Sequence, residues 1–351
     1  MESLKRLMLE LDQIFGVSGD EGRVAAYIKE ELSGKADDFF EDPLGGQYYI
    51  KKGSNPDLKV MLAAHMDEIG FIVTHIDEKG FVYFGPVGFH DSRMVIDQVL
   101  TIDTFKGFVN GVTGSKPAHI VSAEEEKKAI PIEKLHLDVG TDSYNETLEL
   151  GVRVGDYITF DRKGQYLNNG KFFTGKAVDN RAGCAVMVEV MKRLANKQIV
   201  PTVYGVATAQ EEVGIRGAGP AGFIVQPDIA LAIDVTLAGG TPGIEDKDLR
   251  VQLGKGTAIV IYDGGLAVPK KLSKKLIEVA EKENIPYQRE VLLKGATDGK
   301  AISLSGKGVV TGGVSIPSRY IHSAVGMIHL DDLENSVQLI VSFIENLTDK
   351  L

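Results

Sequence analysis

Apolar residues recur at helical spacing near both ends of the chain. Leucine or isoleucine occupies positions 4, 7, 11 and 14, and Gly16 follows as a stop, which predicts an amphipathic helix over residues 4–14. The same spacing predicts further helices over residues 182–194, 270–283 and 333–347.

A second start signal follows the first of these helices. Ser18 and Glu21 are three residues apart and are placed as a capping box. We therefore expect another helix to begin here. Its buried face would be formed by Val24, Ile28 and Leu32.

Short apolar runs alternate with helices in the two outer parts of the chain. The runs at residues 59–64 (KVMLAA), 202–209 and 229–235 are short for helices and suit buried strands. Strands that alternate with helices form a largely parallel or mixed sheet that helices cover on both faces. The sequence therefore predicts an α/β fold in which helices sandwich a mixed sheet.

The middle of the chain has a different residue pattern. Runs of β-branched and aromatic residues alternate there with Gly, Asp and Asn, and no helix of four turns is evident. The runs lie at residues 70–75, 80–84, 99–103 and 155–160. The charged run 124–128 is typical of a solvated loop. We expect a small all-β domain over residues 68–165, inserted into one α/β domain that comprises residues 1–67 and 166–351.

Net charge and cysteine count limit the kinds of partner and metal site that the chain is expected to have. The chain has 351 residues and a formal net charge of −10, which disfavours nucleic acid and anionic membranes as partners because both require clustered positive charge. The single cysteine, Cys184, excludes an intrachain disulfide and a cysteine-rich zinc module. The first residues lack a signal-peptide pattern, and no apolar run approaches the length of a membrane span. We expect a cytoplasmic protein.

Acidic and imidazole side chains follow three of the predicted strands. They are His65 and Asp67, then Glu211 and Glu212, and finally Asp234. Because ligands bind at the carboxyl ends of strands in open α/β sheets, we expect these side chains to meet at one rim. Asp179, just before the helix 182–194, and His322 are further candidates.

A group of carboxylates this dense is costly unless positive charge neutralises it. The basic residue closest in sequence to Glu211 and Glu212 is Arg216. Two divalent metal ions would solve the problem, and imidazole with carboxylate suits zinc, cobalt or manganese. Two histidines, two terminal carboxylates and one bridging aspartate match the ligand count of such a pair.

Each feature taken singly also has a plain structural explanation. A lone His-x-Asp or Glu-Glu pair occurs often by chance, and Asp179 could simply be an N-cap. Cys184 lies on an apolar helical segment, as expected for core packing. The remaining histidines lack a comparable setting and are expected to be structural: His75, His90, His119, His136 and His329.

Five motifs together resemble one family. They are residues 64–71 (AHMDEIGF), 175–183 (GKAVDNRAG), 210–214 (QEEVG), 232–236 (AIDVT) and 316–323 (IPSRYIHS). In this order they resemble the dinuclear-metal aminopeptidases that assemble into tetrahedral particles, metallopeptidase family M42. Within that family the chain is most similar to the glutamyl aminopeptidases of lactic-acid bacteria. The likeness covers essentially the whole chain, and it implies a zinc-peptidase-like fold, with the mixed sheet sandwiched by helices and the small all-β domain inserted.

The resemblance implies a ligand set for two divalent ions per subunit, zinc or cobalt with manganese as a further option. Asp179 would bridge the ions. His65 and Asp234 would complete one site, and Glu212 and His322 would complete the other.

The resemblance also implies two roles beside the metals. Glu211 would be the general base that moves a proton from the metal-activated water to the leaving amine. Asp67 would hydrogen-bond to His65, since a carboxylate behind a metal-bound imidazole fixes its tautomer and raises its basicity.

One position departs from the family pattern and bears on the substrate. Members often carry an aspartate after the Ala-Gly that follows the Asp-Val-Thr motif, but this chain has Gly240. Loss of that negative charge would favour acidic substrate side chains. Because a net charge of −10 repels acidic peptides, such a preference needs local positive charge, for which Lys294 is the leading candidate. Lys255 and Arg319 are further candidates, although both lie in motifs shared by members of other specificity.

The resemblance implies self-association as well. Dimers would form through the inserted β domain, and six dimers would close into a hollow dodecamer. The apolar residues expected to face a partner subunit include Phe71, Phe81, Tyr83, Phe84 and Phe89.

The leading hypothesis is a metal-dependent aminopeptidase that trims Glu and Asp from peptide N-termini. An aminopeptidase of broad specificity, or an amidohydrolase of related fold such as a deacylase or dipeptidase, is the alternative. Some relatives have been labelled endoglucanases, but glycoside hydrolysis normally uses a pair of carboxylic acids. An interaction module with structural metals is disfavoured, because structural zinc sites are usually closed and lack a spare base such as Glu211.

Overall fold

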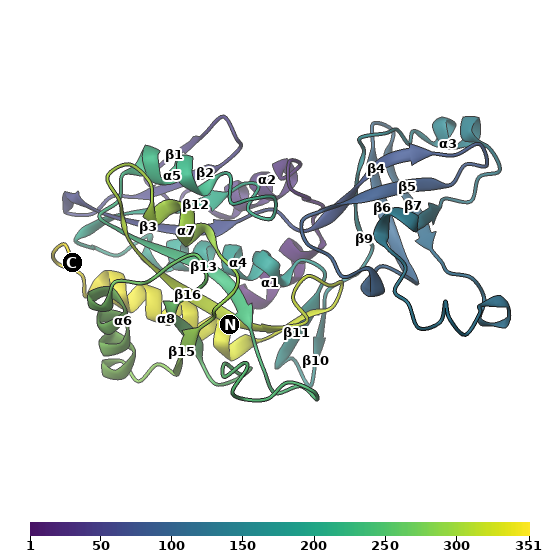
Figure 1. Cartoon of the computed structure of the whole chain (residues 1–351). Coiled ribbons are helices and arrows are strands. Elements are labelled where there is room, and N and C mark those ends of the chain that lie inside the picture. The colour runs from purple at the N-terminus through teal and green to yellow at the C-terminus, as the bar shows by residue number, and fades with distance from the viewer.

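The chain folds into a large α/β unit and a smaller β barrel. A computed structural model describes the backbone of residues 1–351 and every side chain except that at position 118. The barrel projects to the right of the α/β unit in Figure 1, and both chain termini lie on the α/β unit. Within the described structure, no helix combines the length and the apolar character needed to cross a membrane.

The α/β unit is built on an 11-stranded mixed sheet. Its strands are β1 (Asp38–Glu41), β2 (Gln47–Lys51), β3 (Asn55–His65), β10 (Gln165–Leu167), β11 (Phe172–Gly175), β12 (Pro201–Thr208), β13 (Ile229–Leu237), β14 (Thr257–Tyr262), β15 (Tyr287–Val291), β16 (Val310–Arg319) and β17 (Gly326–His329). The order is β1-β2-β12-β3-β13-β16-β17-β11-β10, with β14 paired to β16 and β15 to β14. The central strands β12, β3, β13 and β16 run parallel, so their carboxyl ends meet at one edge.

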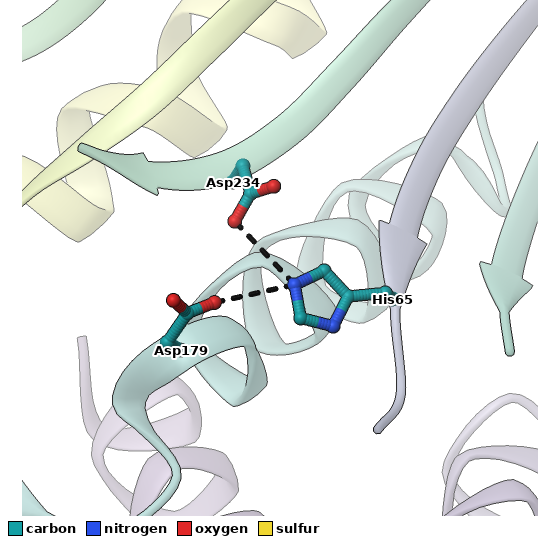
Figure 2. Close-up of side chains that lie close together, drawn as sticks. All are labelled: His65, Asp179 and Asp234. Atoms are coloured by element: carbon teal, nitrogen blue, oxygen red, sulfur yellow. Dashed lines mark ion pairs between the residues drawn. The ribbon is translucent and has the colours of Figure 1, made fainter. Parts of the chain in front are cut away.

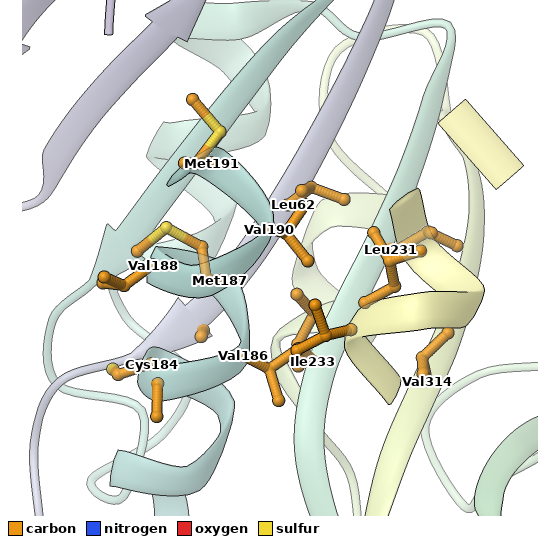
Figure 3. Close-up of a cluster of buried hydrophobic side chains, with 14 of the residues drawn as sticks. Leu62, Cys184, Val186, Met187, Val188, Val190, Met191, Leu231, Ile233 and Val314 are labelled. Carbon is orange, nitrogen blue, oxygen red and sulfur yellow. The ribbon is translucent and has the colours of Figure 1, made fainter. Parts of the chain in front are cut away.

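Helices cover both faces of this sheet. They are α1 (Glu2–Gln13), α2 (Gly22–Glu31), α4 (Val178–Leu194), α5 (Ala218–Val225), α6 (Lys270–Lys282), α7 (Asp298–Ser303) and α8 (Leu330–Glu345). Helix α4 packs Val186 and Val190 near Leu62 and Leu231 in the main apolar cluster (Figure 3). Met61, the neighbour of Leu62, belongs instead to a cluster with α5 and α7, because successive strand residues point to opposite faces.

The inserted unit is a closed barrel of strand order β4-β5-β8-β7-β6-β9. Its elements are β4 (Gly70–Ile76), β5 (Val82–Val87), η1 (Ser92–Met94), β6 (Gln98–Thr104), β7 (Gly107–Thr113), η2 (Ala118–Ile120), η3 (Ile132–Lys134), β8 (His136–Asp138), α3 (Tyr144–Leu150) and β9 (Tyr157–Phe160). Phe71 and Phe84 are fully buried in the barrel's own core. The expectation that these two face a partner subunit is therefore wrong, because their strand positions point inward. Phe89, by contrast, is exposed.

The main predicted elements are present. The helices expected over residues 4–14, 182–194 and 270–283 correspond to α1, α4 and α6, and that over 333–347 overlaps α8. The three apolar runs proposed as strands lie in β3, β12 and β13. The short helix α3 is the one α-helix among the described barrel residues. The domain boundaries at residues 67/68 and 165/166 stay a prediction.

The expected capping box at the start of α2 is wrong. Helix α2 begins at Gly22 and has no side-chain cap. Ser18 Oγ instead donates to Asp67 Oδ2 at 2.6 Å. Glu21 Oε1 accepts from the backbone N–H of Gly19 and of Gln210 at 2.9 and 3.0 Å. Both side chains therefore form hydrogen bonds that stabilise loops at the carboxyl edge of the sheet.

Glu68 joins the barrel to the α/β unit. Its two carboxylate oxygens accept from Lys176 Nζ at 2.5 and 2.6 Å. Thr159 Oγ1 of the barrel strand β9 donates to Oε2 at 3.0 Å, and Gly16 N donates to Oε1 at 3.2 Å. Because this buried cluster joins both units just after β3 ends, it holds the barrel against the edge of the sheet where the candidate residues lie.

Candidate metal centre

The side chains singled out in the sequence meet at the carboxyl edge of the sheet. His65 is the last residue of β3, residues 211–212 follow β12, and Asp234 lies near the end of β13. His322 follows β16 with a left-handed backbone (φ 58°), and Asp179 lies at the start of α4. Parallel strands bring their carboxyl ends together, which explains why residues so far apart in sequence converge.

One group comprises His65, Asp179 and Asp234. Nε2 of His65 lies 3.2 Å from Oδ1 of Asp179 and 3.7 Å from Oδ1 of Asp234. Figure 2 shows both carboxylates turned toward the same imidazole nitrogen. One donor atom from each residue lies within 4.8 Å of the others, so the group offers one nitrogen and two oxygens to a single ion.

A second group comprises Asp179, Glu212 and His322. Nε2 of His322 lies 3.4 Å from Oδ2 of Asp179 and 3.3 Å from Oε2 of Glu212. These donor atoms also lie within 4.8 Å of one another. Asp179 thus faces one histidine with each of its two oxygens, which is the placement that a bridging carboxylate requires.

The start of α4 frees Asp179 for this role. Asp179 and Asn180 have non-helical backbone angles inside the helix bounds. Oδ1 of Asn180 accepts from Gly183 N at 2.9 Å, and its Nδ2 donates to Ile233 O at 2.8 Å. Asn180 therefore supplies the cap that Asp179 could have supplied, and it ties the helix start to β13.

Asp67 organises the loop that carries the two glutamates. Its carboxylate accepts from Glu211 N and Glu212 N, both at 3.0 Å. Nδ1 of His65 lies 3.4 Å from Asp67 Oδ1, but it lies nearer, at 3.1 Å, to the backbone oxygen of Asp67. Burial raises the pKa of Asp67, yet hydrogen bonds from His65 and Ser18 hold it below its usual range. Asp67 is thus an anion that positions Glu211 and Glu212 as well as the imidazole.

The two groups carry excess negative charge. Burial raises the pKa of Glu212 to about 7, and Asp179 adds to the shift. Burial likewise raises the pKa of Asp234 to about 6. Oε1 of Glu212 is buried and finds no hydrogen-bond partner among the described residues. A cation satisfies an orphaned carboxylate oxygen and neutralises its neighbours, so these residues fit divalent metal ions.

Glu211 differs from its neighbour. Its backbone N–H is held by Asp67, while its carboxylate makes no hydrogen bond within the described structure and belongs to neither ligand group. Burial, together with Asp234 and Asp298, raises the pKa of Glu211 to about 10. The side chain is therefore left free beside the ligand groups.

The four specificity candidates are placed differently from one another. Nε and Nη2 of Arg319 donate to the backbone oxygens of Gly239 and Gly240 at 3.2 and 3.1 Å. Gly240 has φ 80°, and a Cβ there would lie 2.8 Å from Arg319 Nη2. Lys294 and Lys255 lie on exposed loops. Arg319 therefore shapes the loop after β13, whereas the two lysines reach into solvent.

Asp298 is a buried acid near the ligand groups that the sequence pattern did not predict as part of the site. It is buried at the N-terminus of α7, and its Oδ2 accepts from Thr208 Oγ1, next to the end of β12. Its Oδ1 has no hydrogen-bond partner among the described residues. The available signal was an acidic residue directly after Thr297, as at a helix start, but nothing in the sequence placed Asp298 beside Thr208.

Comparison with known proteins finds relatives along nearly the whole chain. The family profile described as M42 glutamyl aminopeptidase matches residues 45–339. The lysyl aminopeptidase of Pyrococcus furiosus is 34% identical over 344 residues, which cover 97% of this chain and 96% of that protein. The glutamyl aminopeptidase of Lactococcus lactis is 32% identical over 347 residues, which cover 97% and 96%.

Solved structures extend the likeness to the fold. The TET aminopeptidase of a marine Thaumarchaeota archaeon superposes with a TM-score of 0.95 at 36% identity, covering 99% of this chain and 97% of that one. The TET1 peptidase of Pyrococcus horikoshii, which can assemble into a tetrahedron or a large octahedral shell, has a TM-score of 0.87 at 32% identity. That match covers 98% of this chain and 100% of that one.

Metal binding should release protons. Burial lowers the pKa of His322, but Asp179 and Glu212 raise it to about 11, so the imidazole is protonated at pH 7 in the metal-free protein. A metal ion can bind Nε2 only after displacing this proton. Calorimetric titration of metal-free protein with Zn²⁺ should therefore show a heat that depends on the buffer's ionisation enthalpy, and an affinity that falls as pH falls. Identical heats in two buffers that differ in ionisation enthalpy would contradict the role of His322 as a metal ligand.

Proposed function

The chain belongs to the M42 glutamyl aminopeptidase family, and from this premise we propose that it removes N-terminal residues from peptides, with a preference for Glu and Asp. One observation carries the proposal. Two His-carboxylate groups share Asp179 at the carboxyl edge of the sheet. A shared carboxylate between two ligand groups is the arrangement of hydrolases that use paired metal ions.

The proposed ligands are the members of the two groups. His65 and Asp234 would hold one ion, Glu212 and His322 the other, and Asp179 both. When bound, divalent ions polarise the scissile carbonyl and acidify a water molecule. The nitrogen and oxygen donors suit zinc or cobalt, and manganese is a further option.

Glu211 is the proposed general base. The Asp67 carboxylate accepts from the backbone N–H groups of Glu211 and Glu212, so the backbone at Glu211 is fixed beside Glu212. A divalent cation in the adjacent ligand groups would lower the pKa of Glu211 from the value of about 10 that burial and neighbouring acids give it. In its ionised form, and with no hydrogen bond within the described structure, Glu211 could take a proton from the attacking water and deliver it to the leaving amine. Asp67 itself would keep His65 in the tautomer that presents Nε2, because its backbone oxygen lies 3.1 Å from Nδ1.

The preference for acidic residues is proposed to rest on the loops beside β13 and β15. Lys294 supplies exposed positive charge in the loop that leads to α7. Gly240 leaves Arg319 without an acidic neighbour at that position, since an Asp there would bring its side chain within reach of the guanidinium. Lys255 is a further candidate. Aminopeptidases named for Lys and for Glu resemble this chain to a similar degree, so broad specificity is the nearest alternative.

A related amidohydrolase, such as a deacylase or dipeptidase, is the second alternative. One assay distinguishes these candidate functions. Purified protein supplied with Co²⁺, Mn²⁺ or Zn²⁺ is tested on chromogenic aminoacyl, N-acylated and cellulosic substrates. We expect hydrolysis of the aminoacyl substrates. Activity confined to N-acylated substrates would favour a deacylase, and no aminoacyl hydrolysis with any of these metals would contradict the proposed function.

Subunits are proposed to associate through the barrel. Several apolar side chains stay exposed on the β6–β7 hairpin: Val99, Phe105, Phe108 and Val112. Phe108 also stacks on Phe15 of the α/β unit, with ring centroids 5.7 Å apart. Exposed apolar side chains on one hairpin suit an interaction surface. A structural relative assembles into a tetrahedron or an octahedral shell, and a tetrahedral dodecamer is the assembly we propose here.

The two adjacent glutamates should respond differently to the same substitution. Glu211→Gln should keep the bound metal but lower kcat by about 10²–10⁴-fold, the usual contribution of a positioned acid or base. Glu212→Gln should lower the metal content, because it removes a charged ligand. Steady-state kinetics with metal analysis by mass spectrometry measures both. If metal were lost from the Glu211 variant and kept by the Glu212 variant, the two roles would be reversed.

Substrate preference should depend on Lys294. Lys294→Ala should lower kcat/KM for Glu substrates by about 5- to 30-fold, since a solvent-screened charge pair contributes about 1–2 kcal/mol. Leu substrates should be unaffected. Gly240→Asp should act in the same direction. Lys307→Ala is the matched control, because Lys307 lines a cavity with Lys59, at the opposite end of β3 from His65. Equal losses on Glu and Leu substrates would show that Lys294 does not select the substrate.

The assembly should be visible in solution. Light scattering at neutral pH should give a mass near that of about twelve chains of 38.0 kDa. Phe105→Glu, which places a charge on the exposed hairpin, should reduce this mass, whereas Phe223→Glu on α5 should not. A wild-type protein that stays monomeric would contradict the proposed assembly.

A further inference from the structure

A loop of the barrel reaches the metal centre. Residues 88–91 connect β5 to η1, and in their midst Phe89 lies beside His322, with ring centroids 6.2 Å apart at 48°. The Phe89 side chain is 76% exposed. The barrel's own core closes without it. An aromatic ring is thus presented to solvent at the rim of the candidate site.

The loop is fixed on both sides of Phe89. Gly88 has φ 83°, and a Cβ there would lie 2.7 Å from Ile69 Cγ2 and 3.6 Å from Glu212 Cβ. Nε2 of His90 lies 2.7 Å from Gly70 O, and its ring stacks on Phe71 with centroids 4.3 Å apart. Only glycine combines this positive φ with the close approach to Ile69 without strain. The backbone that carries Phe89 is therefore fixed before any ligand arrives, which reduces the entropy lost on binding.

The loop lies beside His322 of the second ligand group, whereas Lys294 belongs to the loop that leads into α7. The barrel is joined to the α/β unit through Glu68 and Lys176, just before the start of α4. Asp234 lies on the sheet face that α7 covers, because its neighbour Ile233 points to the other face, into the main apolar cluster that contains α4. The loop that carries Lys294 leads directly into α7. A peptide whose first side chain points toward Lys294 would pass over the ligand groups toward Phe89.

We propose that Phe89 binds the substrate residue that follows the scissile bond, so that the barrel contributes to substrate selection as well as to assembly. This inference rests on the proposed function. An aromatic ring offers apolar area and a π-face. Peptides with an apolar or aromatic second residue are therefore bound more tightly than peptides with glycine there.

The test uses the metal-loaded enzyme and two peptides with the same first residue, Glu-Phe-Gly and Glu-Gly-Gly. Phe89→Ala raises KM for Glu-Phe-Gly by about 10-fold, the effect of losing one apolar subsite, and leaves kcat and the KM for Glu-Gly-Gly unchanged. Phe89→Leu restores most of the loss. Phe223→Ala is the matched control, because Phe223 is an exposed phenylalanine on α5.

Four results would overturn the inference. They are equal effects on the two peptides, lower metal content in Phe89→Ala, a changed mass in light scattering, and an effect that follows the first residue of the peptide instead of the second. The second result would make Phe89 a structural support, and the third would place it in a subunit interface. A wild-type enzyme that cleaves neither peptide, nor any aminoacyl substrate, would instead remove the proposed function, and this inference with it.

Discussion

The electrostatic cost of gathering carboxylates at one edge of the sheet governs this structure. Asp179, Glu212 and Asp234 lie within reach of two imidazoles, and burial raises the pKa of two of these acids. Protons on the histidines offset part of the repulsion, but Oε1 of Glu212 stays unpartnered within the described structure. The fold therefore leaves uncompensated negative charge at the two ligand groups, and divalent cations can neutralise it.

Two consecutive acids connect that edge to the rest of the molecule. Asp67 accepts from the backbone of Glu211 and Glu212 and so fixes the loop after β12. Glu68, the next residue, binds Lys176 and Thr159 and so fixes the barrel. Both follow β3 within three residues of His65. A single short turn thus sets the position of a candidate ligand, a candidate base and the second structural unit.

The barrel also contributes residues to the rim of the candidate site. Its loop 88–91 packs Gly88 against Ile69 and places Phe89 beside His322. A closed barrel has no free sheet edges, so it can project from the α/β unit, as Figure 1 shows, without offering strands for unwanted pairing. The exposed apolar residues on its hairpin are then available for contact with other subunits.

The sequence alone determined the strands that deliver His65, Glu212 and Asp234, because short apolar runs and parallel alternation depend on local patterning. It could not settle the partners of Ser18, which pairs with a residue 49 positions away instead of capping α2. Nor did it show that Phe71 lies inside the barrel while Phe89 stays outside. These features depend on strand register and on contacts between distant segments. A local pattern carries no information about such contacts, so only the tertiary structure decided them.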